Sequence, residues 1–119
     1  MSTVEENIAT VVGALCSSRV YPDAAPFGVE RPYAEYQQVG GESITFFSRE
    51  IPSKKNGRFS ISSWADTRMQ AAALARSIED AIVSSNLFDA EPIGGPISQY
   101  EHDLGLFGMT QDFSIFFDD

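Results

Sequence analysis

The stretch from Arg58 to Val83 constrains the fold most, because an alternating strand pattern runs directly into the longest helical pattern of the chain. Phe59 and Ile61 share one side of a two-residue period, while serines occupy the other side. Such an alternation is typical of a half-buried strand. The stretch therefore predicts a strand that leads straight into a helix.

The helical part has both a start signal and an apolar stripe. Asp66 and Thr67 are the two candidate N-caps, and Thr67 forms a capping box with Gln70. The apolar residues that follow recur at steps of three and four, namely Ala71, Leu74, Ala75, Ile78 and Ile82. Its many alanines favour helix intrinsically and allow close approach to a sheet. We therefore expect this helix to cover a sheet.

The rest of the chain predicts one more helix and several strands. A capping box at Thr3 and an apolar stripe up to Leu15 indicate an N-terminal helix. Strands are predicted at 19–22, 33–39, 42–48, 97–103 and 107–117, and irregular structure at 87–96. The expected fold class is α+β, with two helices on one face of a mainly antiparallel sheet and the order α-β-β-β-β-α-β-β.

Composition sets the class of protein. A length of 119 residues predicts a single domain, 1–119, and the 43% hydrophobic content with nine Phe argues against disorder despite a net charge of -9. The lone Cys16 fits a reducing compartment. The sequence shows neither a signal-peptide pattern nor an apolar stretch of about 20 residues, so we expect neither secretion by a cleaved signal nor a membrane span.

The charges are unevenly placed. The basic residues Arg49, Lys54, Lys55 and Arg58 gather in one segment, and we interpret 49–57 as a mobile polar loop. The acidic candidates for a contact or lumen surface lie later in the chain, at Glu91, Glu101, Asp103 and Asp112. Unlike patches on one molecule suit head-to-tail contact between copies, although a solvated acidic surface explains the same charges. The acidic pI of 4.4 argues against broad nucleic-acid binding.

The sequence offers no constellation of catalytic or cofactor-binding residues. His102 is the only histidine, and its acidic neighbours alternate sides in the predicted strand, so they cannot converge on a metal ion. Gly94-Gly95 precedes a proline and a strand, which does not place a helix N-terminus at a phosphate. We therefore predict that the chain is not an enzyme and has no cofactor.

Several segments together resemble a known family. They are Arg19-Val20-Tyr21-Pro22-Asp23-Ala24-Ala25-Pro26, Arg31-Pro32-Tyr33, Tyr36-Gln37-Gln38-Val39-Gly40-Gly41, and the strand entering Trp64-Ala65-Asp66 before an alanine-rich helix. In this order they resemble the small tail-completion proteins of long-tailed phages and prophages. The likeness covers nearly the whole chain.

The resemblance implies a structural role in the virion tail, with assembly in the bacterial host cytoplasm. It implies that copies form a ring, typically a hexamer, at the head-proximal end of the tail tube. Such a ring stops tube growth and joins the tail tube protein to the head-connector protein, with DNA passing through. The main alternative is an acidic regulatory or DNA-mimic protein that occupies a basic nucleic-acid-binding partner. A small-molecule-binding enzyme is a second alternative, which the missing site residues disfavour.

Overall fold

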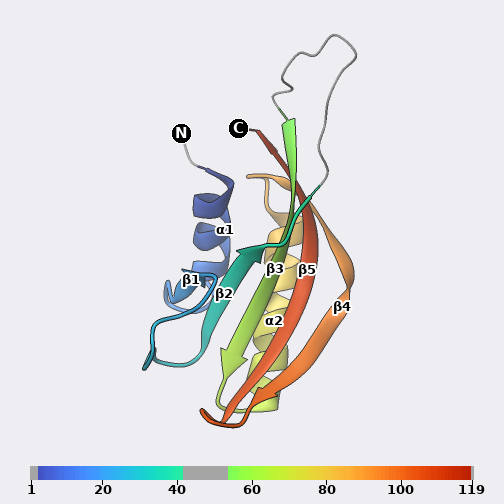
Figure 1. Cartoon of the computed structure of the whole chain (residues 1–119). Helices are drawn as coiled ribbons and strands as arrows, with labels where there is room; N and C mark the ends of the chain where they lie inside the picture. The colour runs from blue at the N-terminus through green and yellow to red at the C-terminus, as the bar shows by residue number, and fades with distance from the viewer. Residues whose placement is uncertain (1–2, 42–53, 119) are drawn as a thin grey trace.

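Two helices lie on one face of a five-stranded sheet in the computed structural model, which describes residues 3–41 and 54–118 (Figure 1). The elements are α1 (Val4–Gly13), β1 (Val20–Pro22), β2 (Tyr33–Gln38), β3 (Lys54–Ala65), α2 (Arg68–Ser84), β4 (Asp89–Glu101) and β5 (Leu106–Asp118). The predicted α+β class and element order are confirmed. The strand expected at 42–48 lies outside the described residues.

The sheet has the strand order β1-β2-β3-β5-β4. β1 pairs parallel with β2, and the other pairs are antiparallel. In the centre, Tyr36 of β2 stands opposite Ile61 of β3, and Phe59 of β3 stands opposite Phe113 of β5. Because directly opposed residues project from the same face, these side chains form one continuous apolar surface. The predicted mainly antiparallel sheet therefore presents Tyr36, Phe59 and Phe113 to the helices.

Both helices begin where the capping boxes predicted. Thr3 Oγ1 accepts a hydrogen bond from the Glu6 backbone N–H at 3.1 Å. Thr67 Oγ1 accepts one from the Gln70 N–H, also at 3.1 Å. Each bond satisfies one of the backbone donors that a helix N-terminus leaves without an intrahelical partner. The structure therefore selects Thr67, and not Asp66, as the N-cap of α2.

The core lies between the two helices and the covered face of the sheet. Phe59, Phe113 and Ile115 are fully buried on the strands. The helices contribute a matching set of buried side chains, Ile8 and Val12 from α1 and Leu74, Ile78 and Ile82 from α2. Fully burying an aliphatic or phenyl side chain stabilises a protein by roughly 1.5–3 kcal/mol. Burial of this cluster therefore fixes both helices against the sheet.

The prediction of irregular structure at 87–96 is wrong. β4 already begins at Asp89, and its pairing with β5 shifts register between Ile93 and Ile97. The prolines and glycines of this segment fit a strand because β4 lies at the sheet edge, where a missing N–H donor is tolerated and a bulge absorbs extra residues. Gln111 Nε2 donates to the Gly94 carbonyl at 2.9 Å and to Glu79 of α2, so one buried amide links the bulge to the helix.

Two other predicted boundaries also differ. Residues 54–57 belong to β3 and not to a mobile loop, because β3 continues its pairing with β5 as far as Lys54 opposite Asp118. Asn56 Nδ2 donates to Ser114 Oγ at 3.0 Å across these strands. The remaining part of the predicted loop, 49–53, lies outside the described residues. The strand predicted to reach Asp103 ends at Glu101, where a turn leads to β5.

Gly108 allows a tryptophan to lie flat across the uncovered face of the sheet. It stands opposite Trp64, and a Cβ at this position would come within 2.7 Å of two carbons of the indole ring. Trp64 Nε1 also donates to Glu35 Oε1 at 2.8 Å, which restricts the ring from moving away. The glycine is therefore required by a close approach and not by a turn.

We predict that Gly108→Ala lowers the free energy of unfolding by about 1–3 kcal/mol, the usual cost of overpacking. Gly95→Ala is the matched control, because a Cβ there meets nothing within 4 Å. The control should stay within about 0.5 kcal/mol of the wild type, as is usual for surface changes. Urea unfolding of the three proteins measures this difference, and equal midpoints for all three would contradict the packing argument.

Because the Cys16 thiol is buried, we expect the protein to lose stability at alkaline pH. Burial raises the pKa of its thiol above the ordinary 9.0, with Arg19 opposing the shift. As the pH rises through 9, the unfolded chain loses this proton before the folded chain does, so unfolding becomes more favourable. Burial also raises the pKa values of Tyr33 and Tyr36 above 10.0, which extends the same trend to higher pH.

The urea midpoint should therefore fall between pH 7.5 and 9.5, and it should fall less in Cys16→Ala, which lacks the thiol. An identical fall in both proteins would assign the effect to other groups.

Candidate assembly surface

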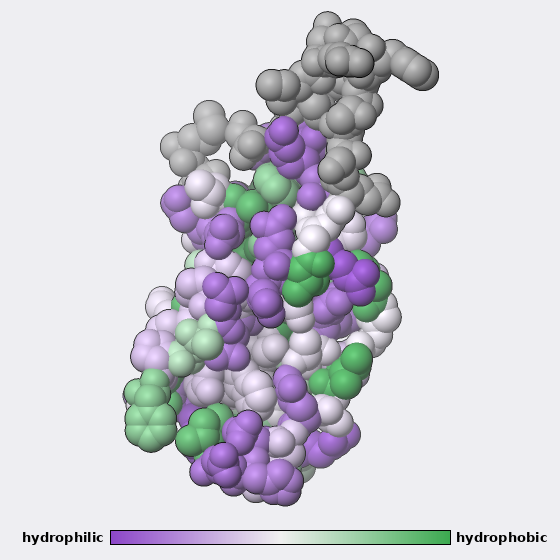
Figure 2. All heavy atoms as spheres, in the orientation of Figure 1, coloured by the Kyte–Doolittle hydropathy of each residue, from purple (hydrophilic) through white to green (hydrophobic). Residues whose placement is uncertain are grey.

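The helices leave one face of the sheet uncovered, and this face is mainly polar (Figure 1, Figure 2). Ser62 Oγ and Thr110 Oγ1 share a hydrogen bond of 2.8 Å across β3 and β5. Arg58 binds Asp112 further along the same strands, with Nη2 at 2.9 Å from Oδ2. Because these polar groups satisfy one another across the strands, the face can remain in contact with water. It is a polar platform, with a hollow of about 290 Å³ whose lining includes Glu35, Ser62 and Thr110.

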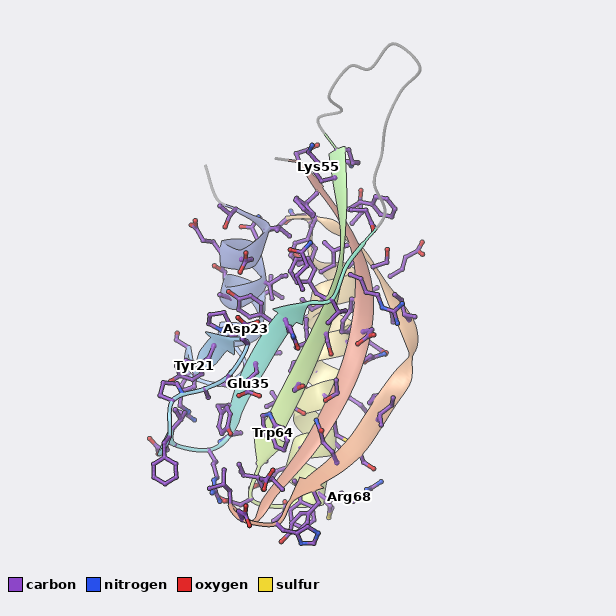
Figure 3. The ribbon with its side chains drawn as sticks, viewed as in Figure 1. Tyr21, Asp23, Glu35, Lys55, Trp64 and Arg68 are labelled. Atoms are coloured by element: carbon purple, nitrogen blue, oxygen red, sulfur yellow. The ribbon has the colours of Figure 1, made fainter. Side chains whose placement is uncertain are left out.

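Glu35 holds the loop between β1 and β2 against this platform. Its Oε1 accepts the Trp64 indole N–H at 2.8 Å, and its Oε2 accepts the Ala25 backbone N–H at 2.6 Å. The nearby Tyr33 phenol has a raised pKa, first because it is buried and second because Glu35 is negative. Hydrogen bonds to a charged acceptor are stronger than neutral ones. Glu35 therefore has a structural role, and Figure 3 shows it between Tyr21 and Trp64.

Arg31 joins three segments at the same end of the sheet. Its Nη1 binds Asp66 Oδ1 at 2.8 Å, just before α2, and its Nη2 donates to the Leu104 carbonyl at 2.8 Å in the β4–β5 turn. The planar guanidinium presents several donors in fixed directions, which suits it to this bridging position. The segment that begins β2, the start of α2 and the β4–β5 turn are therefore held together by one side chain.

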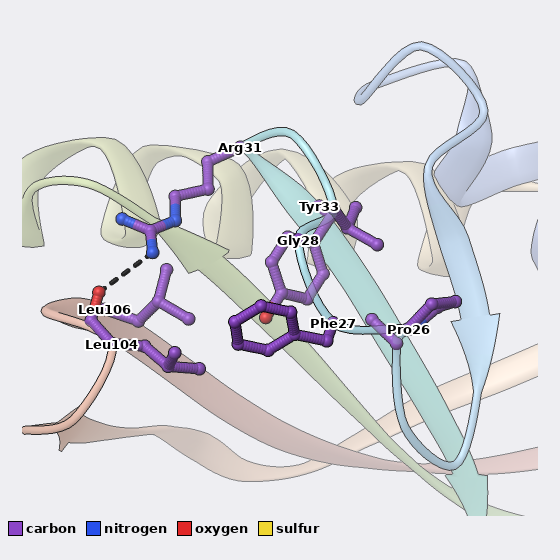
Figure 4. A pocket seen from close by; sticks show the side chains of 9 residues that line it. Pro26, Phe27, Gly28, Arg31, Tyr33, Leu104 and Leu106 are labelled. Carbon is purple, nitrogen blue, oxygen red and sulfur yellow. Dashed lines mark hydrogen bonds between the residues drawn. The ribbon is translucent and has the colours of Figure 1, made fainter.

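An apolar cleft of about 260 Å³ lies beside Arg31 (Figure 4). Its walls include Phe27 and Tyr33 from the β1–β2 side and Leu104 and Leu106 from the β4–β5 side. Phe27 itself is 92% exposed, the largest exposure among the large hydrophobic side chains described. An exposed phenyl ring beside an apolar cleft is typical of a surface that contacts another molecule.

The basic residues predicted as contacts do not form one free patch. Lys54 Nζ lies 3.3 Å from Asp89 Oδ2, and Arg58 binds Asp112. Among the described residues Lys55 has no ion pair, and Figure 3 shows it at the far end of the sheet from Arg68. Arg49 lies outside the described residues.

The predicted acidic residues are also dispersed. Glu91 is exposed on β4, and Asp112 is occupied by Arg58. Glu101 ends β4, and its Oε1 accepts the Asp103 N–H at 3.2 Å within the β4–β5 turn. The structure thus pairs one predicted basic residue with one predicted acidic residue in the same chain, and it separates Glu101 and Asp103 from Lys55 by the length of the sheet.

Sequence reasoning missed the residues that shape the cleft. Phe27, a phenylalanine between a proline and a glycine in a polar loop, was the available signal. The contacts of Arg31 and the bond between Glu35 and Trp64 had no comparable signal, because their partners lie 29 or more residues away in the sequence.

Within 3–41 and 54–118, no group of three or more His, Cys, Asp or Glu residues is placed to hold a metal ion. His102 instead packs edge-on against Tyr100, with ring centroids 4.8 Å apart. No helix in the described part of the chain combines the length and the apolarity needed to cross a bilayer.

Comparison with known proteins identifies the family. The family model described as Tail completion protein gp17 matches residues 4–118, from the first residue of α1 to the last of β5. No curated protein matches the chain. Proteins of this family are structural parts of phage tails and interact with other tail or head components. Because the match covers nearly the whole chain, this protein belongs to the tail completion protein family.

Proposed function

We propose that copies of this chain assemble as a ring on the head-proximal end of the tail tube and join the tube to the head connector. The match of the tail-completion family model to residues 4–118 is the observation that carries this proposal. A hexamer is the expected ring, built in the host cytoplasm and retained in the virion tail. The role is structural and involves no catalysis, and residues 1–119 act as one domain.

The charge distribution supports a division of contacts between the two ends of the sheet. Lys54 and Arg58 form ion pairs with Asp89 and Asp112 of the same chain. Lys55 is therefore the basic residue of this segment that we assign to a contact with another protein. The acidic turn Glu101–Asp103 lies at the opposite end of the sheet. Opposite charges across an interface steer association and fix orientation. We propose that the Lys55 end contacts one axial neighbour, tube or head, and the acidic turn contacts the other.

The uncovered sheet face is the proposed lining of the ring. Glu91 is exposed there, and the remaining polar groups are largely paired across β3 and β5. A polar, weakly acidic wall repels the phosphate backbone, which favours free passage of DNA. The family match, and not the charge distribution, disfavours the acidic-mimic alternative, because among the described carboxylates ion pairs involve only Asp66, Asp89 and Asp112.

We predict that a phage lacking this chain makes filled heads and separate tails with tubes of irregular length. Electron microscopy of the particles, with and without the chain supplied in trans, measures the fraction of joined virions. Complementation should restore joining, because the ring both ends the tube and binds the connector. Normal joined virions in the absence of the chain would overturn the proposed function and make basic host proteins the partners to seek.

Lys55→Glu should reduce the fraction of joined virions in the same assay and weaken the dependence of joining on salt concentration. Charge reversal removes the attraction that guides the encounter, and salt screens such attraction between exposed groups. Lys54→Gln is the control, because the exposed Lys54–Asp89 pair is worth only about 0–1 kcal/mol. Equal joining by both variants would exclude Lys55 from the contact.

A further inference from the structure

The loop between β1 and β2 presents Phe27 on a well-held support. The loop starts with the Asp23 N–H donating to the Tyr36 carbonyl at 2.8 Å, and the Ala25 N–H donates to Glu35. At its other end Arg31 binds Asp66 and the Leu104 carbonyl. A loop that is already held in position loses less entropy when it binds, so the exposed ring that it carries is suited to act as a contact residue.

A hollow of about 290 Å³ lies on a different surface, the outer side of the helical layer. It is mainly apolar, and it is lined by Leu15, Pro32, Gln70, Ala73, Leu74 and Ser77. Small residues at Ala73 and Ser77, one helical turn apart, open this side of α2 to close approach. Met69, one turn before Ala73, is 83% exposed and adds apolar surface at the start of the helix.

The charges around the two features are complementary. Asp23 and Glu30 are exposed on the Phe27 loop, and neither has an ion pair within the part of the chain that the structure describes. Arg76, three residues after Ala73 and next to Ser77, is exposed on α2 and likewise has no ion pair among those residues. In a chain of net charge -9, self-association is opposed by repulsion unless the contact joins such unlike groups.

We propose that Phe27 of one copy inserts into the α2 hollow of the next copy, with the acidic loop beside Arg76. Because the projecting ring and the hollow lie on different surfaces of one chain, the contact is head-to-tail. Repetition of a head-to-tail contact closes into a ring when the rotation between copies permits. This inference rests on the proposed ring and names the contact that builds it.

A disulfide test detects the contact directly. In a Cys16→Ala background, Pro26→Cys is made in one batch of protein and Ser77→Cys in another, which leaves Phe27 in place. The two variant proteins are mixed and oxidised mildly in solution. The same oxidation is carried out on tails that were assembled with both variants. We expect a cross-linked dimer from this mixture. Ile97→Cys, on the 72% exposed β4 position, is the control with Ser77→Cys and should give no cross-link.

A second measurement tests the energy of the contact. Phe27→Ser should weaken self-association, measured by sedimentation, by about tenfold or more, as expected for a central aromatic contact. It should lower the number of joined virions formed on complementation by a similar factor. Ile97→Ser should resemble the wild type. Glu30→Arg and Arg76→Glu should each weaken both readouts, and the double variant should recover them, because the charges are exchanged and not lost.

The failures of the two proposals are distinguishable. Joined virions without any chain would overturn the proposed function, whatever the cross-link shows. If joining requires the chain, but the Pro26–Ser77 cross-link is absent from tails and Phe27→Ser complements as well as Ile97→Ser, the function stands and the docking contact is wrong.

Discussion

The pairing of β3 with β5 is the interaction on which the rest of the structure depends. It runs unbroken from Lys54 opposite Asp118 to Ala65 opposite Phe107 and places Phe59 opposite Phe113 at the centre of the core. Both phenyl rings are fully buried, so the helices have a continuous apolar surface to cover. A one-residue slip in this register would turn every buried side chain to the solvent face. The burial of one face therefore fixes the register, and the register in turn aligns the polar groups of the other face.

The end of the sheet that carries the β4–β5 turn is organised by a few polar side chains and not by a second core. Arg31 and Glu35 each bind two groups from different segments of the chain. Such bonds add little net stability when they are partly exposed, yet they restrict geometry strongly. Their effect is to hold an exposed aromatic ring and an apolar cleft in fixed positions. A structural tail protein needs surfaces of this kind, because assembly depends on preformed contacts rather than on a reactive group.

Much of the fold was predictable from local patterns. The two capping boxes located both helix starts, and the alternation around Phe59 and Phe113 identified the central strands and the face that is buried. The errors fell where edge position overrides residue preference. Pro92 and Gly94 argue locally against a strand, but an edge strand with a bulge accommodates them. Lys54 and Asn56 suggest a loop, but a long neighbouring strand offers them pairing partners.

The sequence by itself determined the α+β class, the starts of both helices and the family likeness, because these depend on residues that are close together in the chain. It extended the first helix to Leu15, whereas α1 ends at Gly13. Only the tertiary structure decided how the charges are used. It pairs Arg58 with Asp112 and Lys54 with Asp89, across 54 and 35 residues, and so removes from the surface some of the charge that the sequence displays. It also decided which apolar residues remain uncovered. Burial depends on packing between elements, and the loop pattern around Phe27 does not reveal that this ring stays exposed beside an apolar cleft.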